Sequence, residues 1–221
     1  MTISTIDLLK NGAHFGHRKS KKHPKMDEFI FTIRNEVAII DLQKTKEKLE
    51  QAIEFIKNLL ADKKKILFVG TKKQAKDKTK EVAESLGQPY VNNRWLGGTL
   101  TNFEVIRRNL QKLLTLEAKK AAGDFSKYTK KERLLLNQQI DKLNLTVGGL
   151  RGLDKLPDAV FIFDVKTEDT AKREAIRKKL PLVAVVDADS DPTGVDYVIP
   201  ANDDAISSVN YIFDAIQANL K

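Results

Sequence analysis

The sequence predicts an α/β protein built on a doubly wound, mostly parallel sheet, with helices on both faces and an inserted pair of helices. Continuous apolar runs at residues 66–69, 159–163 and 182–186 are typical of parallel strands that are covered on both sides. Amphipathic helical patterns alternate with these runs, which favours right-handed crossovers between parallel strands. A long charged segment, residues 103–147, interrupts this alternation and has a helical periodicity of its own.

The N-terminal part of the chain predicts a short helix followed by two short strands. Ser4 is suited to cap the helix, because its side-chain oxygen can accept a hydrogen bond from a free backbone N–H group. The basic residues 14–26 follow, and we expect them to form a lysine-rich loop. Residues 29–33 and 37–40 are rich in β-branched and aromatic side chains and predict two strands or a small hairpin.

The next segment predicts one strand between two helices. Asp41 is expected to cap a long helix with a single core-facing stripe: Leu49, Ile53, Ile56 and Leu60. The strand at residues 66–69 ends at Gly70 and Thr71, which are expected to open the second helix.

The α/β alternation resumes after the charged segment. Residues 159–163 predict a strand, and a helix begins near Thr167 with acidic residues in its first turn, as the helix dipole favours. Residues 182–186 predict a buried strand and residues 195–199 a shorter one. The final helix is expected from about Asn202, with apolar residues on one face.

Residues 103–147 predict two antiparallel helices that form a projecting hairpin with coiled-coil packing. Their apolar residues step by three and four on either side of Gly123 and Asp124. Each arm of about 20 residues would reach on the order of 30 Å, which is too far to lie within a compact domain of this size. We therefore expect an α/β domain formed by residues 1–102 and 148–221, and an inserted hairpin formed by residues 103–147.

The composition excludes several classes of protein. The chain has no cysteine, so neither disulfides nor thiolate metal sites can form. Its start lacks the apolar core of a signal peptide, and no apolar run approaches the roughly 20 residues that cross a bilayer. We expect a soluble, cytoplasmic protein with no membrane partner.

The charge is unevenly distributed along the chain. The formal net charge is +9, and five basic residues but no acidic ones occur between residues 14 and 26. Residues 63–80 contain eight lysines against one aspartate, whereas residues 185–221 contain seven aspartates against one lysine. This polarity predicts a nucleic acid on the basic side and solvent or a protein partner on the acidic side.

Residues 92–102 form the stretch least typical of a buried core. It contains the only tryptophan, Trp95, between Asn93-Arg94 and the adjacent Gly97 and Gly98. One interpretation is a loop in which Trp95 stacks on RNA, Arg94 contacts a phosphate and the glycines let backbone approach a partner. The other is that Trp95 fills a gap in the core and the glycines only turn the chain. Residues 99–102 are expected to cap the first hairpin helix.

Candidate ligand sites are weak by comparison. Gly70 to Lys73 follow a strand and could receive a phosphate, but neither a P-loop nor a dinucleotide fingerprint is present. His14 and His17, with carboxylates of residues 187–191, could hold a structural ion near His17 and Asp187, although a solvated turn is the more common meaning of such a run. We find no nucleophile with an adjacent base, no cofactor motif and no signal for a small-molecule substrate.

Four motifs in order along nearly the whole chain resemble the family of bacterial small-subunit ribosomal protein S2. They are LKNGAHFGH at residues 9–17, NRWLGGTLTN at 93–102, LPDAV at 156–160 and DPTGVDYVIPANDDA at 191–205. The second motif is the most specific. Since the sequence stops soon after the final helix, we expect no counterpart of the longer C-terminal tail of some relatives.

The resemblance implies a flavodoxin-like three-layer domain with an inserted coiled-coil hairpin. It further implies a structural constituent of the small ribosomal subunit, bound to ribosomal RNA near the junction of head and body, added late in assembly and associated with the mRNA-binding protein S1 and other small-subunit proteins. It implies no enzymatic activity and no cofactor. Two alternatives remain: a nucleotide-binding enzyme or switch on a Rossmann-like sheet, and a free-standing RNA-binding regulator.

The residues expected to contact RNA all lie in the N-terminal half and are basic, amide, hydroxyl, aromatic or glycine residues. They are Arg18, Lys19, Lys21, Lys22, His23, Lys72, Lys73, Asn93, Arg94, Trp95, Gly97, Gly98, Thr99, Asn102, Arg107 and Arg108. The cations would mainly meet phosphates and position the protein without reading sequence. Asp203 and Asp204, in the acidic C-terminal end, are expected to face a protein partner.

Overall fold

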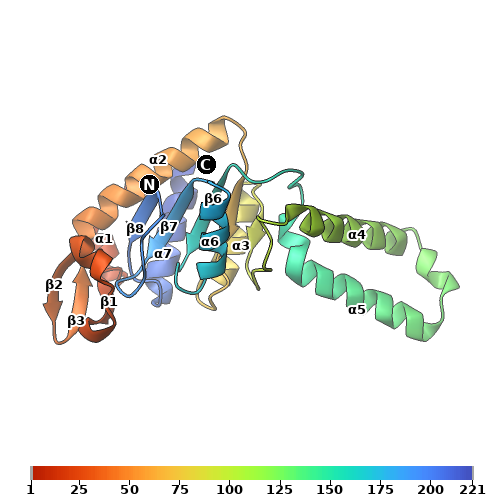
Figure 1. Ribbon diagram of the computed structural model, residues 1–221, viewed down its shortest axis with the longest axis horizontal. Coiled ribbons are helices and arrows are strands. Elements are labelled where there is room, and N and C mark those ends of the chain that lie inside the picture. The colour runs from red at the N-terminus through yellow and green to blue at the C-terminus, as the bar shows by residue number, and fades with distance from the viewer. Residues whose placement is uncertain (1, 221) are drawn as a thin grey trace.

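A five-stranded parallel sheet forms the centre of the protein (Figure 1). The computed structural model describes residues 2–220. In space the strands follow the order β5 (Tyr90–Val91), β4 (Ile66–Val69), β6 (Ala159–Phe163), β7 (Leu182–Val186) and β8 (Tyr197–Pro200), and all neighbouring pairs are parallel. Counted along the chain, this is the 2-1-3-4-5 order of flavodoxin-like sheets. The predicted fold class is confirmed.

Helices cover both faces of this sheet. One face packs against α1 (Thr5–Lys10), α2 (Leu42–Ala61), α3 (Lys76–Ser85) and α7 (Ile206–Leu220), and the other against α6 (Asp169–Arg177). The strands divide their residues between the faces with a period of two: Ile66 and Phe68 join the first core, Leu67 and Val69 the second. Because both faces are covered, strands β4, β6 and β7 are apolar throughout.

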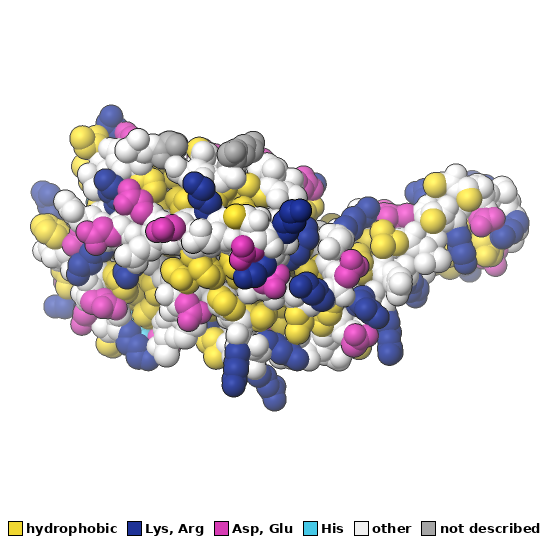
Figure 2. Space-filling view, turned by 90° about the horizontal axis from the view of Figure 1, so that it is seen from above, with side chains coloured by type: hydrophobic (Ala, Val, Ile, Leu, Met, Phe, Trp, Pro, Cys, Tyr) yellow, Lys and Arg dark blue, Asp and Glu magenta, His cyan; other side chains and the backbone are white. Residues whose placement is uncertain are grey.

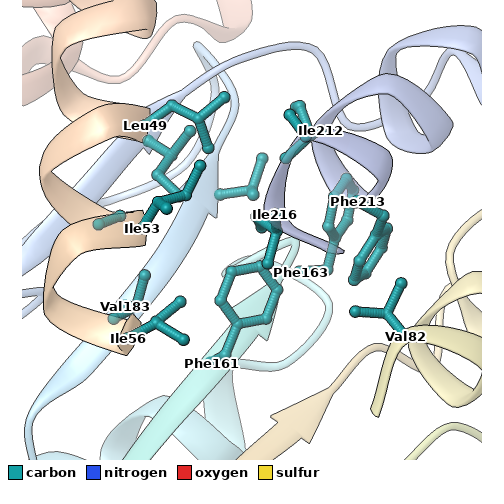
Figure 3. Packing of buried hydrophobic residues seen from close by; sticks show 14 of the residues in the cluster. Leu49, Ile53, Ile56, Val82, Phe161, Phe163, Val183, Ile212, Phe213 and Ile216 are labelled. Atoms are coloured by element: carbon teal, nitrogen blue, oxygen red, sulfur yellow. The ribbon is translucent and has the colours of Figure 1, made fainter. Parts of the chain in front are cut away.

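The first core contains the predicted stripe of α2 (Figure 3). Leu49, Ile53 and Ile56 face α7 and the sheet, whereas Leu60 is only partly buried. Phe163 stacks on Phe213 of α7 with ring centroids 4.9 Å apart. Each fully buried side chain of this size contributes about 1.5–3 kcal/mol of transfer free energy.

A small antiparallel sheet, in the order β1 (Phe15–Arg18), β3 (Val37–Ile40) and β2 (Ile30–Arg34), lies at one end of the molecule (Figure 1). The predicted hairpin is confirmed, with Asn35 and Glu36 in the left-handed conformation that two-residue turns require. The loop predicted for residues 14–26 is wrong: this segment forms β1 and two 3₁₀ helices, η1 (Lys19–Lys21) and η2 (Pro24–Phe29). Its strand is an edge strand, where polar side chains are tolerated.

Contacts between the two ends of the chain hold this N-terminal region in place. The amide of His23 donates to the carbonyl of Ala188 at 2.8 Å, and the amide of Asn202 donates to the carbonyl of Ala13 at 3.0 Å. The side chain of Asn202 also donates to the carbonyl of Gly12 at 3.1 Å. The small sheet is thus fastened to loops that follow β7 and β8.

A pair of helices, α4 (Phe103–Ala121) and α5 (Lys130–Val147), projects from the opposite end (Figure 1). Two 3₁₀ helices, η3 (Asp124–Lys127) and η4 (Gly148–Leu150), flank α5. Thr129 and Glu132 form a reciprocal capping box at the start of α5. Ile106, Leu110 and Val147, near the base of the pair, belong to the same apolar cluster as the sheet. Coiled-coil supercoiling and the division into two units stay predictions.

Two helix boundaries and one strand differ from expectation. Helix α3 begins at Lys76 rather than at Gly70-Thr71, because residues 72–75 form a separate turn. Helix α7 begins at Ile206, after Asn202 has accepted hydrogen bonds from the amides of Asp204 and Ala205. Strand β5 has only two residues, too few for a periodicity signal. None of the helices described between residues 2 and 220 is long and apolar enough to span a membrane.

Candidate nucleic-acid interface

The loop of residues 92–102 connects β5 to α4 and has two distinct faces. Leu100 is fully buried, and Trp95 and Leu96 pack partly buried against the second core. The exposed residues are Asn93, Arg94, Gly97 and Asn102. The loop therefore turns its apolar side chains inward and presents polar groups and one glycine outward.

Glu174 of α6 organises the inner face of this loop. Its Oε1 accepts hydrogen bonds from Trp95 Nε1 at 3.0 Å and from the Gly98 amide at 2.8 Å. Its Oε2 accepts from the amides of Leu100 and Thr101 at 2.9 and 3.0 Å, and from the Thr101 hydroxyl at 3.0 Å. Burial is the largest influence on the pKa of Glu174 and would raise it, but the donors of Thr101, Trp95, Gly98 and Leu100 together lower the pKa below its usual value.

This arrangement bears on whether Trp95 packs against the core or stacks on RNA. The structure shows the packing interpretation, since the ring is partly buried and its N–H group is used within the chain. Stacking of Trp95 on RNA stays a prediction. The amide of Gly98 points to Glu174, so it is Gly97, whose position has no heavy atom within 4 Å of an added Cβ, that leaves backbone open to a partner.

The predicted cap of α4 is wrong in its detail. Asn102 occupies the N-cap position but makes no side-chain capping hydrogen bond. The hydroxyl of Thr99 is buried and donates to the carbonyl of Leu96 at 2.6 Å. The loop is tightened instead by its own backbone, with the Asn102 amide donating to the Gly98 carbonyl at 2.8 Å and Gly98 at φ 93°.

The basic N-terminal segment presents a mixed surface. Arg18, Lys19 and Lys21 are exposed, whereas Lys22 is half-buried and pairs with Asp27. His23 is also half-buried, and its Nδ1 accepts a hydrogen bond from the amide of Lys25 at 3.3 Å. Arg18, Lys19 and Lys21 are thus exposed and accessible to phosphates, whereas Lys22 and His23 are engaged in local contacts.

Lys72 lies at the topological switch point between β4 and β6, where flavodoxin-like sheets bind ligands. Its Nζ is 2.6 Å from Asp203 Oδ1, 2.7 Å from Asp204 Oδ1 and 3.1 Å from Asp164 Oδ2. Burial is the largest influence on the pKa of Lys72 and would lower it, but these carboxylates outweigh it and raise the pKa. In this conformation Lys72 is engaged within the chain, and Lys73 beside it is exposed.

The candidate phosphate site at residues 70–73, rated weak from the sequence, has backbone donors that are used within the protein itself. The amide of Thr71 donates to Glu168 Oε1 at 2.7 Å, and the amide of Gly70 donates to the carbonyl of Val91 at 3.0 Å. Burial raises the pKa of Glu168. A carboxylate of the chain therefore stands where a nucleotide phosphate would otherwise bind.

The expectation that the acidic C-terminal end faces away from RNA stays a prediction, but the structure places part of this end against Lys72. Asp203 is buried and Asp204 exposed, and both pair with Lys72. Burial, with the charges of Asp164 and Asp187, raises the pKa of Asp203 to about 8. A buried Asp203 cannot present its carboxylate to a partner, so only Asp204 keeps the geometry expected of a contact residue.

His17 joins the same acidic group from β1. Its Nδ1 is 3.3 Å from Asp187 Oδ2, and its Nε2 is 3.4 Å from Asp204 Oδ2 and 3.6 Å from Asp189 Oδ2. The contact with Asp187 is the main reason that the pKa of His17 rises to about 9. Ligand atoms of His17, Asp187 and Asp204 lie within 4.8 Å of one another, whereas His14 takes no part and contacts the Phe15 ring.

The remaining predicted cations lie at the base of α4. Arg107 and Arg108 are exposed, with Arg107 3.9 Å from Glu104. Helix α4, which carries them, lies at the other end of the molecule from the small sheet β1-β3-β2, which carries Arg18 (Figure 1). Figure 2 shows lysine and arginine side chains spread over one face of the body and along the hairpin, with acidic side chains among them. The predicted phosphate contacts are thus distributed along the molecule rather than gathered in one patch.

Sequence reasoning did not find Glu174, Glu168 or the Lys72 group. A signal for Glu174 was present: it lies between Ala171 and Ala175 on the buried side of α6, where an unpaired carboxylate is costly. Its partners, however, are 73 to 79 residues away along the chain. No local pattern identifies them.

The fold and these surfaces define a flavodoxin-like α/β protein whose usual ligand position is filled by its own side chains and whose main addition is a projecting helical pair. Residues 8–221 match the model of the family described as ribosomal protein S2. The chain belongs to this family, whose members are structural constituents of the ribosome and not enzymes. The expected cytoplasmic, ribosome-associated location follows from that membership.

Similar proteins support the assignment over nearly the whole length. The chain is 50% identical to a protein of Chloroflexus aggregans over 214 residues, covering 97% of this chain and 90% of the relative. It is 49% identical to a protein of Marinobacter nauticus, with 97% and 86% covered, and 48% identical to one of Petrotoga mobilis, with 95% and 73% covered. Each relative is named small ribosomal subunit protein uS2.

Proposed function

We propose that the chain binds small-subunit ribosomal RNA as a structural constituent of the small ribosomal subunit and helps to recruit the mRNA-binding protein S1. The observation that carries the proposal is the outer face of the 92–102 loop. It exposes Asn93, Arg94 and Asn102 directly before Arg107 and Arg108 of α4. Guanidinium groups suit phosphate oxygens, and amide side chains suit sugars and bases. The names of the relatives support the same role.

The salt dependence of RNA binding tests this interface. Replacing Arg94, Arg107 and Arg108 by glutamine should weaken binding of small-subunit ribosomal RNA and reduce the slope of log K against log salt by about 0.7–0.9 per lost phosphate contact. The control carries the same change in charge on exposed lysines of α2 and its end, Lys44, Lys57 and Lys64. If both triple variants show equal slopes, the proposed interface is wrong.

The two rival functions predict different behaviour. A free-standing regulator would sediment apart from small subunits in a sucrose gradient, whereas a subunit constituent co-sediments with them. A nucleotide-dependent switch would bind ATP or GTP in calorimetry. The self-filled position at Lys72 and Glu168 argues against the switch, because a nucleotide phosphate would have to displace a buried carboxylate.

Recruitment of protein S1 can be tested at Asp204, the exposed member of the predicted acidic pair. Asp204 also pairs with Lys72, so the test uses Asp204→Asn and requires an unchanged melting temperature. Such a variant should leave incorporation into small subunits intact while changing the amount of protein S1 that co-purifies with them. Failed incorporation would mean that this side chain serves assembly instead.

A structural ion at His17, Asp187 and Asp204 is a separate proposal. One imidazole and two carboxylates fit the preferences of Zn²⁺, but a proton on His17 and the ammonium of Lys72 compete for the same charge. A melting temperature that falls on adding EDTA, and that no longer responds in His17→Gln, would support the ion. Equal melting temperatures with and without EDTA would contradict it.

A further inference from the structure

A single side chain from outside the 92–102 loop accepts hydrogen bonds from four residues on its inner face. Glu174 is 8% exposed and accepts hydrogen bonds from donors on four residues of the loop: Trp95, Gly98, Leu100 and Thr101. Three of these donors are consecutive or near-consecutive backbone amides that converge on one carboxylate. Converging amides of this kind form an anion-binding concavity, and here the anion belongs to the chain itself.

The position of Glu174 links this loop to the rest of the body. The residue lies in α6, which packs on β6 and β7, so its carboxylate is held by a rigid element. The loop ends at Asn102, and α4 starts at the next residue. A fixed loop therefore also fixes the point at which the helical pair leaves the sheet.

We propose that Glu174 is a positioning residue for RNA binding: it holds the inner face of the loop so that Asn93, Arg94 and Gly97 are presented outward in one arrangement. The inference rests on the proposed RNA-binding function of this loop. Glu174 does not itself contact RNA, because its oxygens are turned inward to the loop's donors. Its effect on binding passes through the loop.

Charge alone predicts the opposite result for a substitution. Glu174→Gln removes a negative charge near the loop, and a simple electrostatic view expects tighter RNA binding. The positioning role expects weaker binding, because the glutamine NH₂ group would face N–H donors where a carboxylate oxygen now accepts. The sign of the change in affinity thus separates the two views.

Asp169→Asn is the matched control. It lies on the same helix, is half-exposed, pairs with Arg173 and changes the net charge by the same amount. Thr101→Val is a milder second variant that removes one hydroxyl donor and leaves the carboxylate in place. Trp95, the only tryptophan, reports directly on the loop by its fluorescence.

The experiment measures RNA affinity, Trp95 emission and melting temperature for the four full-length proteins, with a small-subunit ribosomal RNA transcript as probe and well below each melting temperature. We expect Glu174→Gln to bind roughly tenfold more weakly or worse, a loss of about 1.4 kcal/mol, with red-shifted emission. Thr101→Val should show a smaller loss, and Asp169→Asn should bind at least as well as wild type.

The outcomes are distinguishable. If wild type itself does not bind the transcript, the proposed function fails. If wild type binds and Glu174→Gln binds as Asp169→Asn does, the positioning role is overturned, whatever the change in stability. If Glu174→Gln does not fold, Thr101→Val decides: weaker binding by a folded protein supports the inference, and unchanged binding overturns it.

Discussion

Replacing Lys72 by methionine should destabilise the fold far more than the same change at Lys73, its exposed neighbour. Lys72→Met keeps most of the aliphatic stem but leaves Asp203, Asp204 and Asp164 without the ammonium that lies 2.6, 2.7 and 3.1 Å from them. Breaking a buried ion pair from one side costs about 3–5 kcal/mol. The lower value applies here, because the Lys72 side chain is 16% exposed and that of Asp204 54% exposed.

We therefore expect the free energy of unfolding to fall by about 3 kcal/mol, or the melting temperature by roughly 6–12 °C for a chain of this length. Urea denaturation at neutral pH measures the loss, with Lys73→Met as control. The difference should shrink on acidification, since Lys72 holds the pKa of Asp204 below its usual value and a protonated Asp204 no longer needs the cation. If Lys72→Met and Lys73→Met have the same melting temperature while Lys72→Met reduces the slope of log K against log salt for RNA binding, then Lys72 contacts RNA and does not stabilise the fold.

Three further predictions concern packing and pH. Gly16→Ala should lower the free energy of unfolding by about 1–3 kcal/mol, because the added Cβ would lie 2.7 Å from Ala188 Cβ and 3.0 Å from the Ala38 carbonyl oxygen. Gly97→Ala is the control, since an added Cβ there has no heavy atom within 4 Å and should leave urea denaturation unchanged. Equal losses in the two variants would contradict the reasoning. Phe163→Ala should lower the free energy of unfolding by about 3–5 kcal/mol in the same assay, since the ring is fully buried and stacked on Phe213. A loss smaller than that caused by replacing an exposed phenylalanine would refute its place in the core. The folded pKa of Glu174 lies below its usual value of 4.5, so its stabilisation is present above that pH and is lost as the pH falls through the folded pKa. The stability gap between wild type and Glu174→Gln should accordingly narrow on acidification, and a constant gap would refute the assignment.

Patterns that repeat within one element were sufficient for most of the fold. The apolar runs of β4, β6 and β7 and the stripe of Leu49, Ile53 and Ile56 are local signals, and all became buried as expected. The extent of the helical pair was also predictable, because glycine and aspartate mark its turn and periodicity marks its arms. The strands β1 and β5 were missed since one is polar and the other has two residues.

The sites were less predictable because their partners come from distant parts of the chain. Lys72 was interpreted as a phosphate contact because it follows a strand. In the structure it donates a hydrogen bond to Asp203, which lies 131 residues further along the chain. The charge polarity along the chain likewise does not persist in space, because folding brings His17 next to Asp187. The exposed Arg94, Arg107 and Arg108 keep the geometry that the sequence suggested, and their RNA contacts stay a prediction.

The fastening of the N-terminal sheet to the loops after β7 and β8 has a consequence for the order of folding. The amide of His23 cannot form its hydrogen bond until Ala188 has been made, and the carbonyl of Gly12 needs a side chain 190 residues away. This region is therefore synthesised before the residues that anchor it. Such long-range closure slows folding, because the loop must close before its contacts form. A nascent chain stopped before Ala188 should therefore leave β1 accessible to protease even when α2 has already formed.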